Sequence, residues 1–200
     1  MLDWDQLAPA YGRQLWLERS AIRSLLDVRS DERLLDLATG PATVLAQLAR
    51  RPTRPAVAVG IDSSEAMISR ASPLPAAWRL QIADATRLPF ADHSFDVLTA
   101  SFLLHVLAPA KRQAVIAESA RVLRSGGRLG VVTIAPPRGR LERAITAPAR
   151  SVVSRASGRL IGLRPLDPRP ELEAAGFSAP VARRSFRGYA SLCVTASWGL

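Results

Sequence analysis

Three aspartates, each placed where a short apolar run ends, are the residues of this chain best suited to chemistry. Asp36 lies in LLDLATGPATVL (residues 34 to 45), Asp62 closes AVAVGID, and Asp84 closes WRLQIAD. Carboxylates gathered at one place can accept hydrogen bonds from the hydroxyl and amine groups of a small molecule. The alternative is that they cap helices, and for Asp62, in the sequence DSSE, a capping box fits. Three acids in such apolar surroundings favour a binding site.

The turn after Asp36, LATGPA, indicates which ligand it suits. A pyrophosphate usually needs G-x-G-x-x-G, so that backbone amides can approach the phosphates. Here only Gly40 is present, with Ala38 and Ala42 where further glycines would be expected. The turn therefore suits a ligand without phosphate. S-adenosylmethionine is such a ligand, because an amino acid and a sulfonium stand in place of the pyrophosphate of a dinucleotide.

Apolar runs rich in β-forming residues alternate with helical patterns around these acids. Strands are predicted over residues 33 to 38, 56 to 62, 78 to 84, 95 to 101 and 128 to 134. Helices are predicted over residues 10 to 28, 41 to 50, 64 to 71 and 109 to 123. Pro41 is expected in the first turn of its helix, and Gly126 and Gly127 are expected to stop the last helix. Continuous apolar strands separated by helices indicate a parallel sheet covered on both faces.

The end of the chain departs from this alternation. A short helical pattern in RPELEAAGF ends at Gly176, and two candidate strands follow over residues 181 to 187 and 190 to 198. Only a tight turn near Gly188 joins them, so they must pair antiparallel, because parallel strands need a long crossover. The predicted fold class is therefore α/β, a doubly wound, mostly parallel seven-stranded sheet with a C-terminal antiparallel hairpin.

This fold predicts where the acids lie. In open α/β sheets ligands bind beyond the carboxyl ends of the strands, where the strand order reverses. Residues 36 to 41, Asp62, Asp84 and Ser101 all follow or end predicted strands. We therefore expect them around one crevice, although they are far apart in the sequence.

The composition limits the class of protein. Two hundred residues, 48% of them hydrophobic, are enough for one domain with its own core. Cys193 is the only cysteine, so no internal disulfide can form and a reducing compartment is expected. Neither a secretion signal nor an apolar window long enough for a bilayer is present, which favours a soluble, cytoplasmic protein. The net charge of +10, with Lys111 as the only lysine, either attracts an anionic partner or reflects coding composition.

Four segments in order resemble the motifs of the class I S-adenosylmethionine-dependent methyltransferases. LLDLATGPA resembles motif I, usually DxGxGxG, and VGIDSSEAMISRA is similar to the second motif. QIADATRLPFADHSFDVL resembles the segment that borders the adenine, and ARVLRSGGRLGVV matches the RVLkPGG motif. Together they cover residues 33 to 134 and are most similar to the ubiquinone/menaquinone-biosynthesis-like (type 11) branch. The resemblance implies a Rossmann-like fold and S-adenosylmethionine as the cofactor.

The resemblance also implies cofactor-binding roles for ten residues: Asp36, Ala38, Gly40, Asp62, Ser63, Met67, Asp84, Ala85, Ser101 and Tyr11. Gly40 would let the methionine moiety approach the backbone, with Asp36 orienting the loop or a water near the amino group. Asp62 would accept both ribose hydroxyls, and Asp84 would accept from the exocyclic amine of adenine while Met67 packs nearby. Tyr11 resembles an element that covers the cofactor; a tyrosine packed under a helix is the alternative. Ala38 and Ala42 depart from the family's glycines, and a degenerate site without catalysis is the alternative they raise.

His105, in SFLLHVL just after the fourth predicted strand, is the candidate catalytic residue. In this fold the fourth strand ends beside the transferred methyl group, so an imidazole there could serve as a general base for a hydroxyl or amine acceptor. The alternative is a histidine that only packs beside the core. His93 precedes the same strand, at the opposite edge of the sheet, and is discounted.

The predicted function is methyl transfer to a small-molecule acceptor, apolar in character, such as a quinone precursor, a lipid or a secondary metabolite. Methylation of RNA or another nucleic acid is the alternative that the charge favours, although SFLL stands where a base N-methyltransferase carries its Asn/Asp-Pro-Pro-aromatic tetrad. A NAD-dependent oxidoreductase is disfavoured by the missing glycine fingerprint. No metal site is expected, and the chain is expected to be a monomer or homodimer.

A single methyltransferase domain is predicted over residues 1 to 200, in four parts. These are an N-terminal helical cap (1 to 30), a cofactor-binding core (31 to 134), a basic lid (135 to 164), and a C-terminal helix with an antiparallel hairpin (165 to 200). The segment 138 to 164 carries seven arginines against one acid, Glu142, and a loosely amphipathic pattern. It is predicted to cover the acceptor pocket and to make peripheral contact with an anionic membrane. A solvated linker is the alternative.

Overall fold

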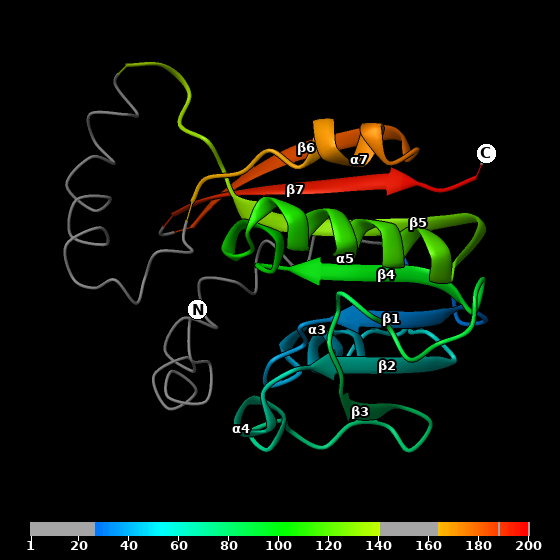
Figure 1. Cartoon of the computed structure of the whole chain (residues 1–200). Helices are drawn as coiled ribbons and strands as arrows, with labels where there is room; N and C mark the ends of the chain where they lie inside the picture. The colour runs from blue at the N-terminus through cyan, green and yellow to red at the C-terminus, as the bar shows by residue number, and fades with distance from the viewer. Residues whose placement is uncertain (1–26, 141–163, 188, 200) are drawn as a thin grey trace.

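The computed structural model describes residues 27 to 140, 164 to 187 and 189 to 199 (Figure 1). The predicted N-terminal helix, Tyr11 and most of the predicted lid lie outside these residues. The strands are β1 (Arg33–Leu37), β2 (Val57–Asp62), β3 (Arg79–Ile82), β4 (Phe95–Ser101), β5 (Leu123–Ile134), β6 (Ser178–Arg187) and β7 (Tyr189–Ser197). The helices are α3 (Thr43–Leu48), α4 (Glu65–Ile68), the 3-10 helix η1 (Leu104–Val106), α5 (Pro109–Val122) and α7 (Arg169–Ala174).

All seven strands form one sheet in the order β3-β2-β1-β4-β5-β7-β6. Strands β1 to β5 pair in parallel, whereas β7 pairs antiparallel with both β5 and β6. The order reverses between β1 and β4, which are neighbours in the sheet although β2 and β3 intervene in the chain. The predicted fold class, including the C-terminal antiparallel hairpin, is confirmed. Its ligand-binding edge is expected at the carboxyl ends of β1 and β4.

Helices cover both faces of the sheet because side chains alternate along each strand. On β1, Leu35 and Leu37 belong to the core cluster that includes α5 and α7, while Leu34 belongs to the cluster that includes α3. Figure 1 shows α5 and α7 on one face and α3 behind the sheet. The buried apolar strands therefore act as a rigid platform, and the loops at their carboxyl ends are free to carry polar groups.

Two predicted boundaries are wrong for reasons of backbone conformation. Pro41 was expected inside the first turn of its helix, but α3 begins only at Thr43, because Ala42 is left-handed, with φ of 57°. The helix that Gly126 and Gly127 were expected to stop already ends at Val122. The next residue, a fully buried leucine, is extended and pairs with β4, so the glycines fall inside β5 at an irregularity of its register.

Candidate functional site

The loop after β1 has a glycine-like backbone although it contains one glycine. Ala38, Gly40 and Ala42 all have positive φ, at 51°, 54° and 57°. The left-handed conformation costs an L-residue with a side chain about 1 to 2 kcal/mol, so two alanines there represent stored strain. The alternating pattern of motif I is thus kept in conformation at all three positions where its glycines usually stand.

Asp36 anchors this loop from inside the sheet. Its side chain is 1% exposed and accepts hydrogen bonds from Thr39 Oγ1 at 2.6 Å and from Thr99 Oγ1 at 2.5 Å. Burial raises the pKa of Asp36 to about 6, against the lowering effect of the two hydroxyls, and Asp62 adds a smaller rise. Because Thr99 lies on β4, the carboxylate ties the first loop to the strand across the switch point.

Asp62 joins the loops that follow β1 and β2. Its Oδ2 accepts the amide of Gly40 at 2.8 Å and its Oδ1 accepts the amide of Ser64 at 2.9 Å. The cap of α4 is Ser64, whose hydroxyl accepts from the amide of Met67 at 3.1 Å. The alternative that Asp62 is a helix cap is therefore wrong, since Asp62 lies two residues before the cap and its Oδ2 faces the first loop.

Asp84 lies two residues beyond the end of β3, on an exposed turn. Its Oδ1 accepts from both the amide and the hydroxyl of Thr86, at 2.8 Å each. The backbone hydrogen bond from Thr86 is the main reason why the pKa of Asp84 is lowered. Ala85 packs against the main core. An ionised carboxylate is thus held at the edge of the sheet that carries Asp62.

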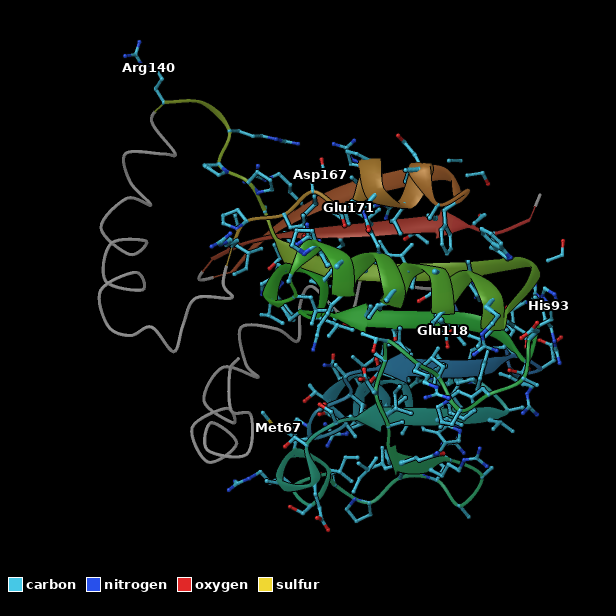
Figure 2. The ribbon with its side chains drawn as sticks, in the orientation of Figure 1. Met67, His93, Glu118, Arg140, Asp167 and Glu171 are labelled. Carbon is cyan, nitrogen blue, oxygen red and sulfur yellow. The ribbon has the colours of Figure 1, made fainter. Side chains whose placement is uncertain are left out.

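Ser63 and Met67 flank the same edge with opposite exposure. Ser63 is exposed, whereas Met67 is 3% exposed on α4. Figure 2 shows Met67 and His93 at opposite ends of the sheet, so His93 lies away from the strand ends that carry the acids. This position agrees with the prediction that His93 is not the catalytic residue.

The end of β4 presents polar groups that have no partner in the described part of the chain. Ser101 Oγ and His105 Nδ1 are both buried and make no hydrogen bond there. His105 is 4% exposed, and this burial lowers its pKa to about 4, so the imidazole is neutral at pH 7. The ring of Phe102 meets it edge to face at 6.0 Å, and Phe102 itself has φ of 58°. The left-handed phenylalanine therefore stores backbone strain next to two buried polar atoms that lack a partner among the described residues.

The roles of three residues at this edge were not predicted from the sequence. Thr39, in the loop after β1, and Thr99, on β4, hold Asp36, and a threonine gives no sequence signal of its partner. Gly60 lies inside β2, where an added Cβ would come within 2.8 Å of Thr39 Oγ1 and 3.0 Å of Leu45. A glycine within a strand pattern is a sign of close backbone approach, and this one could have been found.

The donor set fits S-adenosylmethionine. The cofactor presents a ribose diol, an adenine amine, and a zwitterionic amino acid next to a cationic sulfonium, and the strand ends present the carboxylates of Asp62 and Asp84 beside the loop that follows β1. The charge-assisted hydrogen bonds that these groups can make are the strong kind. Asp36 lies in the last two residues of β1, Asp62 ends β2 and Asp84 follows β3, and these three strands are adjacent, so the structure brings the three acids to one edge.

The sheet order and this edge define a protein of the class I methyltransferase fold. Residues 34 to 127 match the model of the family described as "Methyltransferase domain". The predicted resemblance to S-adenosylmethionine-dependent methyltransferases is therefore confirmed, and the enzyme class and cofactor that it implied agree with the match. No helix of the described residues is long and apolar enough to cross a membrane.

Relatives of this chain that are similar in sequence are also methyltransferases by name. The chain is 40% identical over 124 residues to a demethylmenaquinone methyltransferase of Beutenbergia cavernae, an alignment that covers 62% of this chain and 49% of the relative. It is 36% identical over 120 residues to a ubiquinone/menaquinone biosynthesis C-methyltransferase of Geobacter sulfurreducens, covering 56% and 46%. The chain thus spans about half the length of these relatives.

Solved structures share the fold over nearly the whole chain. One comes from the complex between the Haloferax volcanii Trm112 methyltransferase activator and a methyltransferase, with a TM-score of 0.75 and 17% identity over 100% of this chain and 99% of that one. Another is an S-adenosylmethionine-dependent methyltransferase of Thermotoga maritima, with a TM-score of 0.72 and 16% identity over 97% of both chains. At such identities the likeness concerns the fold.

Proposed function

We propose that the chain is an S-adenosylmethionine-dependent methyltransferase that acts on a small, largely apolar acceptor. The observation that carries this proposal is the asymmetry of the binding edge. Hydrogen-bonded acids occupy the ends of β1 to β3, and unpaired buried polar groups occupy the end of β4. The first set suits the cofactor, and the second suits an acceptor that brings its own polar group.

When bound, S-adenosylmethionine supplies a methyl group on a sulfonium, which a nucleophile can attack in line. The protein's own part is to hold and align the two reactants, and alignment alone can contribute on the order of 7 kcal/mol. Asp62 would hold the ribose and Asp84 the adenine amine, with Met67 beside the ring. Asp36 would keep the first loop in place.

His105 is proposed to meet the acceptor as a neutral imidazole. A neutral ring can accept a hydrogen bond from an acceptor hydroxyl, and its low pKa makes it a weak proton acceptor. Ser101 Oγ offers a second hydrogen-bonding group on the same strand end. Both groups would otherwise remain buried without a partner, which costs about 1 to 3 kcal/mol for each.

An apolar acceptor such as a quinone precursor is supported by the names of the two relatives, which act in menaquinone or ubiquinone biosynthesis. Exposed arginines near the end of β5 support an acceptor at an anionic membrane surface: Arg138, Arg140 and Arg164. The amide of Leu166 donates to the carbonyl oxygen of Ile134 at 3.0 Å, so the chain lies beside the end of β5 again at Leu166. The predicted basic lid would then lie between the pocket and the membrane.

The remaining predictions form part of the same proposal. We infer one cytoplasmic methyltransferase domain over residues 1 to 200, with the four parts given above, as a monomer or homodimer. The buried Cys193 has no disulfide, as a reducing compartment permits. Nucleic acid is the less favoured acceptor.

Two measurements test the function. Calorimetric titration should detect S-adenosylhomocysteine but no comparable heat from NAD or NADP, and the reverse ranking contradicts the proposal. Transfer of radiolabel from the cofactor should then be tested on a demethylated naphthoquinol, an anionic lipid and a mixed RNA. Labelling of RNA alone would replace the proposed acceptor class, and labelling of the quinol alone would narrow it.

A further inference from the structure

Arg121, in the last turn of α5, uses its whole guanidinium group at the loop between β3 and β4. Nη1 donates to the carbonyl oxygen of Phe90 at 2.8 Å and to Asp92 Oδ1 at 2.7 Å. Nη2 donates to the carbonyl oxygen of Leu88 at 3.1 Å. Nε and Nη2 also donate to Oε1 and Oε2 of Glu118, both at 2.8 Å. A guanidinium has five N–H donors, and each has a partner here.

Glu118 lies one turn earlier on α5 (Figure 2) and also holds the loop. Arg121 and Glu118 together are called the clamp. Its Oε2 accepts the amide of Leu88 at 2.6 Å, so one pair of side chains holds both backbone polar groups of that residue. The hydrogen bond from Arg121 is the main cause that lowers the pKa of Glu118, which keeps the pair ionised at neutral pH. The Leu88 side chain is 5% exposed in the main core. The loop is therefore fixed at Leu88 by charge and by packing.

The turn that carries Asp84 lies immediately before this clamp. Thr86 donates twice to Asp84 Oδ1, and the amide of Arg87 donates to the carbonyl oxygen of Asp84 at 3.0 Å. At the other end of the turn, the amide of Ala83 donates to the carbonyl oxygen of Asp62 at 3.0 Å. The turn is thus held at both ends, by the end of β2 before it and by the clamp at Leu88 after it.

We propose that Arg121 is a positioning residue for recognition of the adenine amine. Through Glu118 and Leu88 it sets the place of the turn that carries Asp84, and it does so from α5, on a different element from the acid. The inference rests on the proposed function, because Asp84 is the group assigned to the adenine. A lysine cannot replace Arg121, since it has three donors on a flexible stem and no planar fork.

The test compares two ligands that differ at the position Asp84 is assigned to read. S-adenosylhomocysteine carries the exocyclic amine, whereas S-inosylhomocysteine has a carbonyl oxygen there. Calorimetry of both on the wild type and on Arg121→Lys gives a ratio of affinities for each protein. Arg124→Lys is the matched control, because Arg124 pairs with Asp96 at 2.9 Å and donates to the carbonyl oxygen of His93 at 3.1 Å, beyond the turn.

We expect Arg121→Lys to bind S-adenosylhomocysteine about tenfold more weakly, the equivalent of one strong hydrogen bond, with little change for the inosyl compound. The affinity for S-adenosylhomocysteine divided by that for S-inosylhomocysteine should therefore be smaller in Arg121→Lys than in the wild type. Arg124→Lys should keep the wild-type ratio. Glu118→Gln should shrink it less, because its amide oxygen can still accept from Leu88. This milder variant carries the test if Arg121→Lys does not fold. An unchanged ratio in both variants, with only a lower melting temperature, overturns the inference.

Failure of this inference is separable from failure of the proposed function. If the wild type prefers S-adenosylhomocysteine but methylates no acceptor, the acceptor proposal fails and the role of Arg121 stands on the ratios. If the wild type binds both ligands equally, adenine recognition by Asp84 fails and this inference falls with it. If it binds neither, both are overturned.

Discussion

The two halves of the ligand-binding edge satisfy their buried polar groups in different ways. At the ends of β1 and β2, Asp36 and Asp62 accept hydrogen bonds from hydroxyls and amides of the neighbouring loops and of β4. At the end of β4, Ser101 and His105 are buried with no partner among the described residues. Backbone strain occurs on both sides, with left-handed alanines after β1 and a left-handed Phe102 after β4.

On the proposed function, the half assigned to the cofactor is organised before any ligand arrives, whereas the half assigned to the acceptor is completed by its ligand. A satisfied network fixes loop positions, because moving one loop would break hydrogen bonds in another. Unpaired groups carry a desolvation cost that a ligand can relieve.

The largest effect is expected when the two buried groups with shifted pKa values are replaced one at a time, because their contributions to the free energy of unfolding change with pH in opposite directions. The pKa of Asp36 rises from 3.8 to about 6, so its ionisation lowers stability as pH rises from about 4 to 6. The pKa of His105 falls from 6.5 to about 4, so stability is gained as pH rises through about the same range. Each contribution is about 3 kcal/mol, and in the wild type they largely cancel.

Asp36→Asn and His105→Gln should separate these contributions. Urea unfolding at pH 4 and pH 6.5 gives the free energy of unfolding for each protein. The free energy of unfolding of the wild type minus that of Asp36→Asn should decrease by about 3 kcal/mol from pH 4 to pH 6.5. The corresponding difference between the wild type and His105→Gln should increase by a similar amount. Differences that do not vary with pH would mean that both groups are solvated or paired.

Asp62→Ala is expected to weaken binding of S-adenosylhomocysteine about ten- to a hundredfold, since charge-assisted hydrogen bonds contribute about 1.5 to 3 kcal/mol. The variant also leaves the amides of Gly40 and Ser64 without their acceptor, so a lower melting temperature should accompany the loss. Asp31→Ala, at an exposed acid before β1, is the control. Unchanged affinity in calorimetry would reduce Asp62 to a structural link between the loops.

For the acceptor half, His105→Ala should lower kcat about tenfold while leaving cofactor affinity unchanged, the equivalent of one hydrogen bond to the acceptor. His105→Gln should recover part of the rate, because an amide can make the same bond without taking up a proton. The rates of the wild type and of His105→Gln should depend on pH in the same way from pH 5 to 8, since the imidazole stays neutral there and Asp36, with a pKa of about 6, is present in both proteins. A rate that rises with pH in the wild type but not in His105→Gln, with no recovery of rate in the glutamine variant, would instead assign His105 as a general base.

The smallest effect is expected from the strained loop. Ala38→Gly should raise the free energy of unfolding by up to about 1 kcal/mol, because relief of the left-handed strain exceeds the added entropy of the unfolded chain. Ala46→Gly, within α3, is the control and should lower it by about 1 kcal/mol. If both variants are destabilised equally, the loop does not store strain.

Much of the fold could be predicted because it depends on local patterns. Alternating apolar strands and helices predict a parallel sheet, and the short turn near Gly188 permits only an antiparallel hairpin. The three acids were found because each follows an apolar run. The boundaries were harder, since the left-handed Ala42 delays α3 and Leu123 is drawn into β5 by burial and pairing, neither of which the residue type reveals.

The sequence alone therefore predicts which acids lie at or near the ends of strands, and which cofactor suits a turn with a single glycine. The contacts of those residues come from the folded chain: Asp36 is held by Thr99, Ser64 and not Asp62 caps α4, and His105 is neutral. The physical reason is that partners and solvation come from strands and loops distant in the chain. A carboxylate or imidazole acquires its pKa and its hydrogen bonds from those neighbours, and no local pattern records them.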